Sequence, residues 1–213
     1  GNRGYMQTAF QSVQYPRESR VDKIEGYLII GVTVNAEAMV SAQFYTHLDK
    51  EIERVFTEYL NSTSGKWVNT GAPYQVFMSF VFNQSNYFTE HLNTFIPGFP
   101  NYYCNQLLPP LVFSAIRPTS LSGGSEDLMK QAGQFKNRFD RMEKKYQSHL
   151  EKDKIKKAYE SLNEMIRFNP FNEEFLVERI ELEKELGRDD YRKYDIPWIV
   201  ALRKMKAQGV FEQ

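Results

Sequence analysis

Apolar side chains recur at every second position in two segments of the first half of the chain, residues 27–35 and 74–83. A period of two is typical of β-strands, because successive side chains point to opposite faces of a sheet. In the first segment one face is apolar and the other mixed, which predicts a sheet that packs a helix on one side. The apolar face comprises Ile24, Gly26, Leu28, Ile30, Val32 and Val34.

A shorter strand candidate and a helix candidate lie between these two segments. Residues 39–46 follow a break at residues 35–38 and predict a second strand. Residues 49–60 carry apolar side chains at helical spacing, so they predict a helix whose apolar face can cover the sheet. Its apolar positions are Leu48, Ile52, Val55, Phe56 and Tyr59.

The strand predicted at residues 74–83 carries large apolar side chains on both faces. One face carries Tyr74, Val76, Met78, Phe80 and Phe82. The opposite face carries Gln75, Phe77, Ser79 and Val81. Because large apolar side chains need cover, Phe77 and Val81 predict that another part of the chain or a partner lies against this second face.

The sequence after residue 84 is less regular. Residues 87–95 are compatible with a short helix, and residues 97–100 predict a turn because they combine proline and glycine. The apolar, partly β-branched run at residues 111–116 predicts a fourth strand or a buried extended segment. If this run pairs with the sheet, it covers an edge that a ligand would otherwise use.

From Gly124 onward the pattern is helical. An apolar seam of about three heptads predicts a helix that packs against the following helices, since so few heptads do not make an independent coiled coil. Pro197 predicts the first turn of a final helix over residues 198–206. The seam comprises Leu128, Ala132, Phe135, Phe139, Met142 and Tyr146.

The charged residues are distributed unevenly. Residues 1–117 contain 17 Asp, Glu, Lys and Arg side chains, and residues 118–213 contain 37. The boundary falls in residues 117–125, which have the Ser, Gly and Pro content of a linker. We therefore predict the α+β fold class, with a small antiparallel sheet and one packed helix in residues 1–117 and a helical domain in residues 118–213.

Composition excludes several partners and sites. The chain has 27 basic and 27 acidic side chains, so no general attraction to nucleic acid is expected. It contains no apolar run of the length that crosses a bilayer and no signal peptide, and its start at Gly1 without a methionine predicts that an N-terminal segment has been removed. The single cysteine, Cys104, excludes an internal disulfide and a metal site built on paired cysteines.

No motif points to catalysis. His47, His91 and His149 lie in unrelated surroundings, and His47 fits a surface or capping position beside a helix start. Nucleophile elbows and phosphate-binding or dinucleotide-binding glycine motifs do not occur. Paired carboxylates such as Glu181 and Glu183 lie on helices that also carry Lys and Arg, as on a solvated face. The sequence predicts a protein that is not an enzyme, without metal or cofactor.

The order of short motifs over residues 15–83 resembles the C-terminal domain of TonB-type energy transducers, which are cell-envelope proteins. A Tyr-Pro and an Arg precede an Ile-x-Gly entry to the first strand, a Leu-Asp-x-Glu starts the helix, and a Lys-Trp and a Gly precede a last strand ending in Phe-Asn. The resemblance implies a protein-binding sheet and a periplasmic or envelope location. The matching residues are Tyr15, Pro16, Arg20, Ile24, Gly26, Leu48, Asp49, Glu51, Arg54, Lys66, Trp67, Gly71, Phe82 and Asn83.

The chain departs from that family in two places. Residues 35–38 offer no glycine for the turn between the first two strands, so a longer or differently built turn is expected. The chain also continues for more than a hundred residues, where family members end soon after the last strand. In this extension Ala158, Leu162, Met165 and Pro170 have the spacing of a tetratricopeptide unit. Because no second copy of the unit occurs at the same period, a generic helical hairpin is the favoured interpretation.

Two functional hypotheses follow. In the first, the chain is a non-enzymatic envelope module that binds a protein partner by adding its strand to the sheet, as the resemblance implies. The strand at residues 74–83 is then the partner-binding element, with Gln75, Phe77, Ser79 and Val81 facing the partner. In the second, the sheet is only a scaffold and the helical region acts as an adaptor or assembly surface.

Overall fold

The computed structural model describes residues 8–9, 11–83, 111–114 and 125–207. These residues belong to two compact units. The sheet unit comprises the described residues up to 83 together with residues 111–114, and the helical unit comprises residues 125–207. The predicted domain boundary between residues 117 and 118 lies outside the described residues, as do the helix predicted at residues 87–95 and the turn at residues 97–100.

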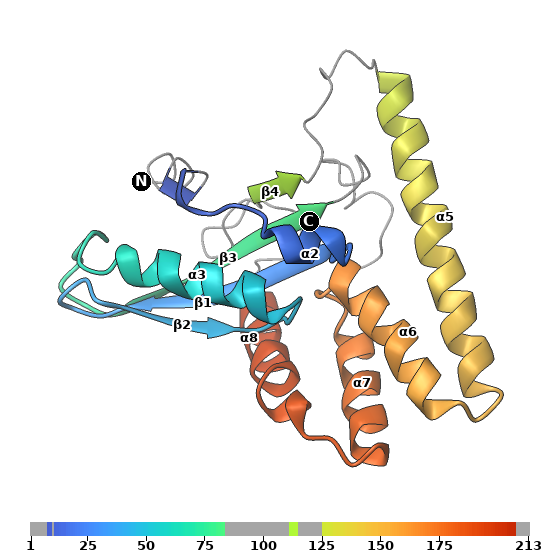
Figure 1. Ribbon diagram of the computed structural model, residues 1–213. Coiled ribbons are helices and arrows are strands. Elements are labelled where there is room, and N and C mark those ends of the chain that lie inside the picture. Colours follow the sequence, from blue (N-terminus) through green and yellow to red (C-terminus); the bar gives the residue numbers. More distant parts are fainter. Residues whose placement is uncertain (1–7, 10, 84–110, 115–124, 208–213) are drawn as a thin grey trace. The chain divides into compact units, whose positions relative to one another are not determined.

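In its described residues, the sheet unit combines helices with a sheet of four strands, coloured blue to green in Figure 1. Its helices are α2 (Arg17–Val21) and α3 (Lys50–Ser62). The strands are β1 (Gly26–Val34), β2 (Val40–Phe44), β3 (Tyr74–Asn83) and β4 (Leu111–Ser114). The α+β class predicted from the sequence is confirmed, and β3 has the predicted bounds.

The strand order in the sheet is β2-β1-β3-β4. β1 pairs antiparallel with β2 from Ile30↔Phe44 to Val34↔Val40, and with β3 from Gly26↔Phe82 to Val34↔Tyr74. The predicted fourth strand is therefore present, but it is parallel to β3 and lies beside only its last four residues, Phe80–Asn83. β3 is consequently an interior strand over this length, whereas β2 is an outer strand.

One face of the sheet packs against α3, as the apolar alternation predicted (Figure 1). Leu28, Ile30 and Phe80 are fully buried there with Ile52 and Phe56 of the helix. α3 begins where expected, because Asp49 caps it by accepting a hydrogen bond from the Ile52 N–H at 2.8 Å. Burial of large side chains between two layers is the main source of stability for such a unit.

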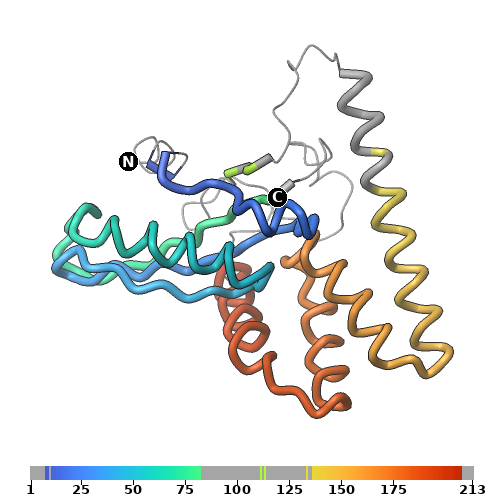
Figure 2. The backbone as a smooth tube through the Cα atoms, in the orientation of Figure 1, coloured from blue at the N-terminus to red at the C-terminus, as the bar shows by residue number. Residues whose placement is uncertain are grey.

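The turn between β1 and β2 is built without glycine. Ala38 adopts a φ of 60°, and the Asn35 side chain accepts hydrogen bonds from the Glu37 and Met39 N–H groups at 3.0 and 2.8 Å. The Asn35 carboxamide thus organises the turn in the manner of an Asx-turn. Figure 2 shows this turn and the α3–β3 loop at the same end of the sheet, where the Gly65 N–H donates to the Ala38 carbonyl at 2.9 Å.

The helical unit is a series of antiparallel helices in which each packs against the next. They are α5 (Ser125–Leu150), α6 (Ile155–Phe168), α7 (Glu173–Glu185), the short 3-10 helix η1 (Asp190–Arg192) and α8 (Asp195–Ala207). The described end of the predicted seam, Phe139, Met142 and Tyr146, is buried. Pro197 lies in the first turn of α8 as predicted, although the helix begins two residues before it.

Candidate protein-interaction site

The outer strand β2 leaves one edge of the sheet open. The Tyr45 N–H donates to the Ile29 carbonyl at 2.9 Å, and the Asn35 N–H donates to the Met39 carbonyl at 3.0 Å. Hydrogen-bonded pairs alternate along an antiparallel ladder, so Ser41 and Gln43 direct their main-chain groups toward β1. Val40, Ala42 and Phe44 therefore direct theirs away from β1, toward the outer edge.

Two of these three residues have main-chain groups available for pairing. The Val40 N–H already donates to the Ser64 hydroxyl at 3.2 Å. In the described part of the chain, the outward N–H and C=O groups of Ala42 and Phe44 have no hydrogen-bond partner. The side chains of Ser41, Ala42 and Gln43 are exposed, so no residue of the described chain covers this segment. We call Ala42–Phe44 the open edge.

Partly buried apolar side chains lie in and beside the open edge, on the side of α3. Val40, Phe44 and Val55 pack against the main core but retain some exposure. An added strand would bury more of these side chains while its main chain pairs with Ala42 and Phe44. The open edge thus combines main-chain hydrogen bonding with an apolar contact.

The residues predicted to bind a partner occupy a different environment. Phe77, Ser79 and Val81 are buried, with exposed fractions of 5%, 0% and 1%, and only Gln75 is exposed. By the same alternation along the ladder, these four residues direct their main-chain groups away from β1, toward the side on which β4 lies. β4 takes the position beside Val81, and the pairing begins at Phe80. The structure thus places the four residues on one face of β3, which pairs with β1 along its length and with β4 only over its last four residues.

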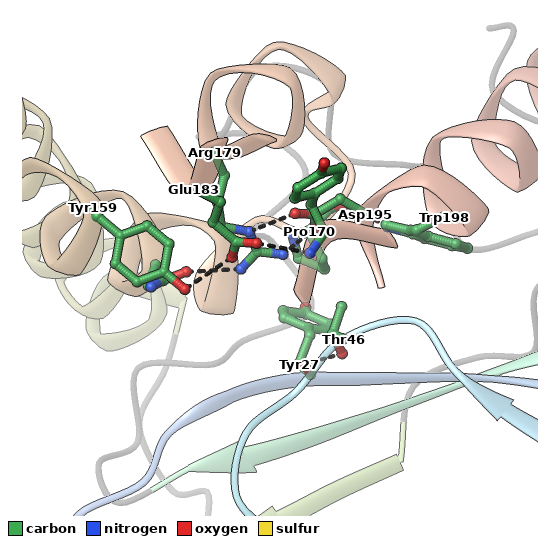
Figure 3. A network of polar contacts seen from close by, with 10 residues as sticks. Tyr27, Thr46, Tyr159, Pro170, Arg179, Glu183, Asp195 and Trp198 are labelled. Carbon is green, nitrogen blue, oxygen red and sulfur yellow. Dashed lines mark hydrogen bonds and ion pairs between the residues drawn. The ribbon is translucent and has the colours of Figure 1, made fainter. Parts of the chain in front are cut away.

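Thr46 fixes the end of β2 against β1 (Figure 3). Its hydroxyl accepts a hydrogen bond from the Ile29 N–H and donates one to the Tyr27 carbonyl, each at 2.8 Å. Thr46 is 3% exposed, so both main-chain groups would lose their partner in a dry environment if the hydroxyl were removed. Periodicity along the chain does not predict this role, because Thr46 bonds to residues 17 and 19 positions earlier.

The helical unit contains a buried ionic contact between α7 and α8 (Figure 3). The Arg179 guanidinium donates hydrogen bonds from two nitrogens to the Asp195 carboxylate, with Nε at 3.0 Å from Oδ2. Its third nitrogen donates to the Asn163 side-chain oxygen on α6 at 2.9 Å. Asp195 is 1% exposed. Burial raises the pKa of the Asp195 carboxyl, and the Arg179 contact opposes that rise.

Glu183 forms a second polar contact in the same unit. Its carboxylate accepts hydrogen bonds from the Tyr159 hydroxyl at 2.9 Å and from the Tyr191 N–H at 2.7 Å, which joins α6, α7 and η1. Burial raises the pKa of the Glu183 carboxyl, and the two hydrogen bonds oppose the rise. The Trp198 indole adds a bond to the Pro170 carbonyl at 2.6 Å. Each of these groups faces a partner within the unit, so the arrangement orients helices rather than presenting a free acid or base.

The histidines of the described chain stand apart from these contacts. His47 is exposed and its Nδ1 lies 2.6 Å from Glu53 Oε1, beside the start of α3 as expected for a surface position. The pKa of His149 is lowered by desolvation and by nearby lysines. His91 and Cys104 lie outside the described residues. Within the residues that can be placed, no group of three His, Cys, Asp or Glu side chains is arranged to hold a metal ion.

Among the helices that the structure describes, none combines the length and the apolarity needed to cross a bilayer. No protein-family model, curated protein or solved structure matches this chain, so the geometry of its own residues is what argues for a function.

Proposed function

We propose that this chain is a non-enzymatic protein-interaction module of the cell envelope, in which a TonB-like sheet pairs with an extended segment of another polypeptide. The observation that carries the proposal is the open edge of β2, with unpartnered main-chain groups at Ala42 and Phe44 and an apolar border beside them. Strand addition uses these two features, because main-chain bonds give affinity and side-chain contacts give preference.

Contacts among the residues that carry the resemblance support the TonB-like part of the proposal. The Tyr15 hydroxyl donates to the Ile24 carbonyl, and the Tyr15 ring meets Phe82 edge-on at 5.0 Å. The Trp67 indole donates to the Thr63 hydroxyl at 2.9 Å, and Gly71 has a φ of 74°. Tyr15 thus contacts both Ile24 and Phe82 within the sheet unit, which supports a structural role for these three motif residues.

The open edge replaces β3 as the element that we expect to capture the partner. β4 pairs along Phe80–Asn83, and strand addition to β3 would have to begin where that pairing stops. β2 offers the outward main-chain groups of Ala42 and Phe44, and its sequence from Val40 to Phe44 contains no charged residue and no proline. Natural sheets usually protect exposed edges with these residues, so their absence favours pairing.

A proline at position 42 tests this proposal without breaking the sheet. The Ala42 N–H points away from β1, so Ala42→Pro removes an outward donor and no bond to β1. Peptides of extended conformation would be selected from a displayed random library on the natural sequence. Their affinity should fall about tenfold or more on Ala42→Pro, because a hydrogen bond and the close approach of the strand are lost.

Ala42→Ser is the matched control, since it keeps the main-chain donor. Selected peptides should bind it as they bind the natural sequence, and should slow hydrogen exchange at the Ala42 and Phe44 amides. Peptides that bind Ala42→Pro undiminished, or that protect other amides instead, would show that the open edge is not the binding element.

The helical unit offers a second candidate, an adaptor surface. Ile196 and Val200 lie one turn apart on α8 and are 44% and 62% exposed. A chain ending at Arg117 separates the candidates, because peptide binding at the open edge should survive this truncation. Binding that disappears with the helical unit would favour the adaptor function.

A further inference from the structure

The open edge is symmetric about Gln43, and this symmetry suggests what it pairs with. Two residues, Ala42 and Phe44, flank Gln43 and supply two outward N–H and two outward C=O groups. Val40 lies outside this set because its N–H is bonded to Ser64. A matching partner strand would form hydrogen bonds with these two N–H and two C=O groups and would require no further main-chain group of β2.

The open edge of a second copy of this chain provides such a strand. When two copies pair antiparallel about a two-fold axis through Gln43, Ala42 of each copy lies opposite Phe44 of the other. Hydrogen-bonded antiparallel pairs exchange both main-chain bonds, so the arrangement forms four bonds and leaves no outward donor of Ala42 or Phe44 unpaired. This register does not use the Val40 N–H, which is bonded to Ser64.

The side chains fit the same register. Ala42 and Phe44 project on the α3 side of the sheet, because they pair with Val32 and Ile30 of β1. Each Phe44 therefore lies beside the small Ala42 of the other copy, so large and small side chains alternate across the contact. The two exposed Gln43 side chains meet on the opposite face, where a carboxamide can both donate to and accept from its copy.

Charge does not oppose this contact. The chain carries equal numbers of acidic and basic side chains, and Val40–Phe44 has neither kind. Like charges opposite each other on paired strands are destabilising, and none would meet here.

We propose that the open edge binds a second copy of this chain, forming a two-fold symmetric dimer through antiparallel β2–β2 pairing centred on Gln43. This inference rests on the proposed function, since it names the strand that fills the edge. The dimer joins two sheets into one continuous sheet, and another extended segment reaches the edge only by displacing the second copy.

A charge exchange at position 43 tests the symmetry directly. Gln43→Lys and Gln43→Glu each place two like charges across the two-fold axis, where facing Cα atoms of a non-hydrogen-bonded pair are only about 4.5 Å apart. Sedimentation of each variant alone should show a dimer dissociation constant raised about tenfold or more, which corresponds to about 1.4 kcal/mol. An equimolar mixture of the two variants should recover dimers, because Lys then faces Glu.

Gln11→Lys and Gln11→Glu are the matched controls, since Gln11 is exposed and lies outside β2. They should sediment as the natural sequence does. A natural chain that stays monomeric up to about 1 mM, where association is worth only about 4 kcal/mol, would overturn the dimer. Dimers that persist unchanged in Gln43→Lys, or a mixture that fails to recover them, would overturn it too.

These outcomes separate the dimer from the proposed function. Library peptides that bind in an Ala42→Pro-sensitive way to a monomeric chain would leave the proposed function standing and remove the self-pairing. A dimer that responds to charge exchange, on a chain that binds no peptide at the edge, would keep the self-pairing and remove the capture of other proteins.

Discussion

The two units bury polar groups in different ways. In the sheet unit, β2 is fixed to β1 by the neutral hydroxyl of Thr46. In the helical unit, α7 is fixed to α8 by the ion pair of Arg179 with Asp195. A buried neutral group left unpaired costs about 1–3 kcal/mol, whereas removing one member of a buried ion pair costs about 3–5 kcal/mol. Removing one buried polar partner should therefore lower the free energy of unfolding more in the helical unit than in the sheet unit.

The two tryptophans of the chain allow each unit to be followed separately. Trp67 packs against the core of the sheet unit, and Trp198 is fully buried in the helical unit. Replacing one by Phe leaves a chain whose fluorescence reports on the other unit during denaturation.

The largest effect is expected from Asp195→Asn. The substitution keeps the shape of the side chain but removes the carboxylate that pairs with the Arg179 guanidinium, which is 13% exposed. We expect the free energy of unfolding seen by Trp198 in urea to fall by about 3 kcal/mol or more.

Glu173→Gln is the control for this substitution. Glu173 pairs with the exposed Arg203 at the surface, so its loss should cost no more than about 1 kcal/mol. If Asp195→Asn shifts the Trp67 transition as much as the Trp198 transition, the units unfold together and the comparison between them fails.

A smaller effect is expected from Thr46→Val in the sheet unit. It leaves the Ile29 N–H and the Tyr27 carbonyl without the hydroxyl that now pairs with both. The Trp67 transition should lose about 2 kcal/mol, and Thr46→Ser should restore most of it because the hydroxyl returns. A loss equal to that of Asp195→Asn would remove the contrast between neutral and ionic contacts.

Gly31→Ala probes close packing on the second face of the sheet. An added Cβ would lie 2.5 Å from Cε2 of Tyr45, whose ring packs against Phe77 at a centroid distance of 5.7 Å. Because Tyr45 is 5% exposed and has little room to move, we expect a loss of about 1–3 kcal/mol in the Trp67 transition. The double variant Gly31→Ala, Tyr45→Leu should lose less than the sum of its single changes, and strict additivity would show that the two residues do not meet.

The smallest effect concerns pH. Burial raises the pKa of Glu183 above its unfolded value of about 4.3, so the folded state binds more protons than the unfolded state between these two values. The contribution of this carboxyl to stability therefore increases as the pH falls from neutrality through the folded pKa. It should amount to no more than about 1.4 kcal/mol for each unit by which the pKa is raised.

Glu183→Gln removes this titration. The free energy of unfolding that Trp198 reports for the natural chain, measured relative to the Gln variant, should increase as the pH falls from neutrality toward the unfolded pKa of about 4.3. Parallel profiles for the two chains would show that Glu183 is not held at a raised pKa.

The sequence predicted β1, β3, α3 and the strand at β4, but it did not predict α2. The period of two marked β1 and β3, and Asp49 marked the start of α3. The segment at residues 111–116 was a strand candidate, and its first four residues form β4. The sequence did not show that β4 would lie beside β3, because periodicity reports which face of a strand is buried and not which strand is its neighbour.

The candidate site was less predictable for the same reason. Gln75, Phe77, Ser79 and Val81 share a face as expected, and their role in binding a partner stays a prediction. The open edge on β2 depends on strand order, which sets the outer strand, and on the ladder, which sets the direction of the Ala42 and Phe44 amides. The side chains of residues 40–44 predict neither the strand order nor the direction of these amides.

Local chemistry and side-chain periodicity were enough to determine the type and the position of most elements, because propensity, capping and burial act within a few residues of each position. Only the tertiary structure decided the neighbours: β4 beside β3, Arg179 on Asp195 sixteen residues away, and Thr46 against a strand that begins twenty residues earlier. These pairings bring together groups distant in sequence, and their selection depends on the free energy of the whole packed unit rather than on any single segment.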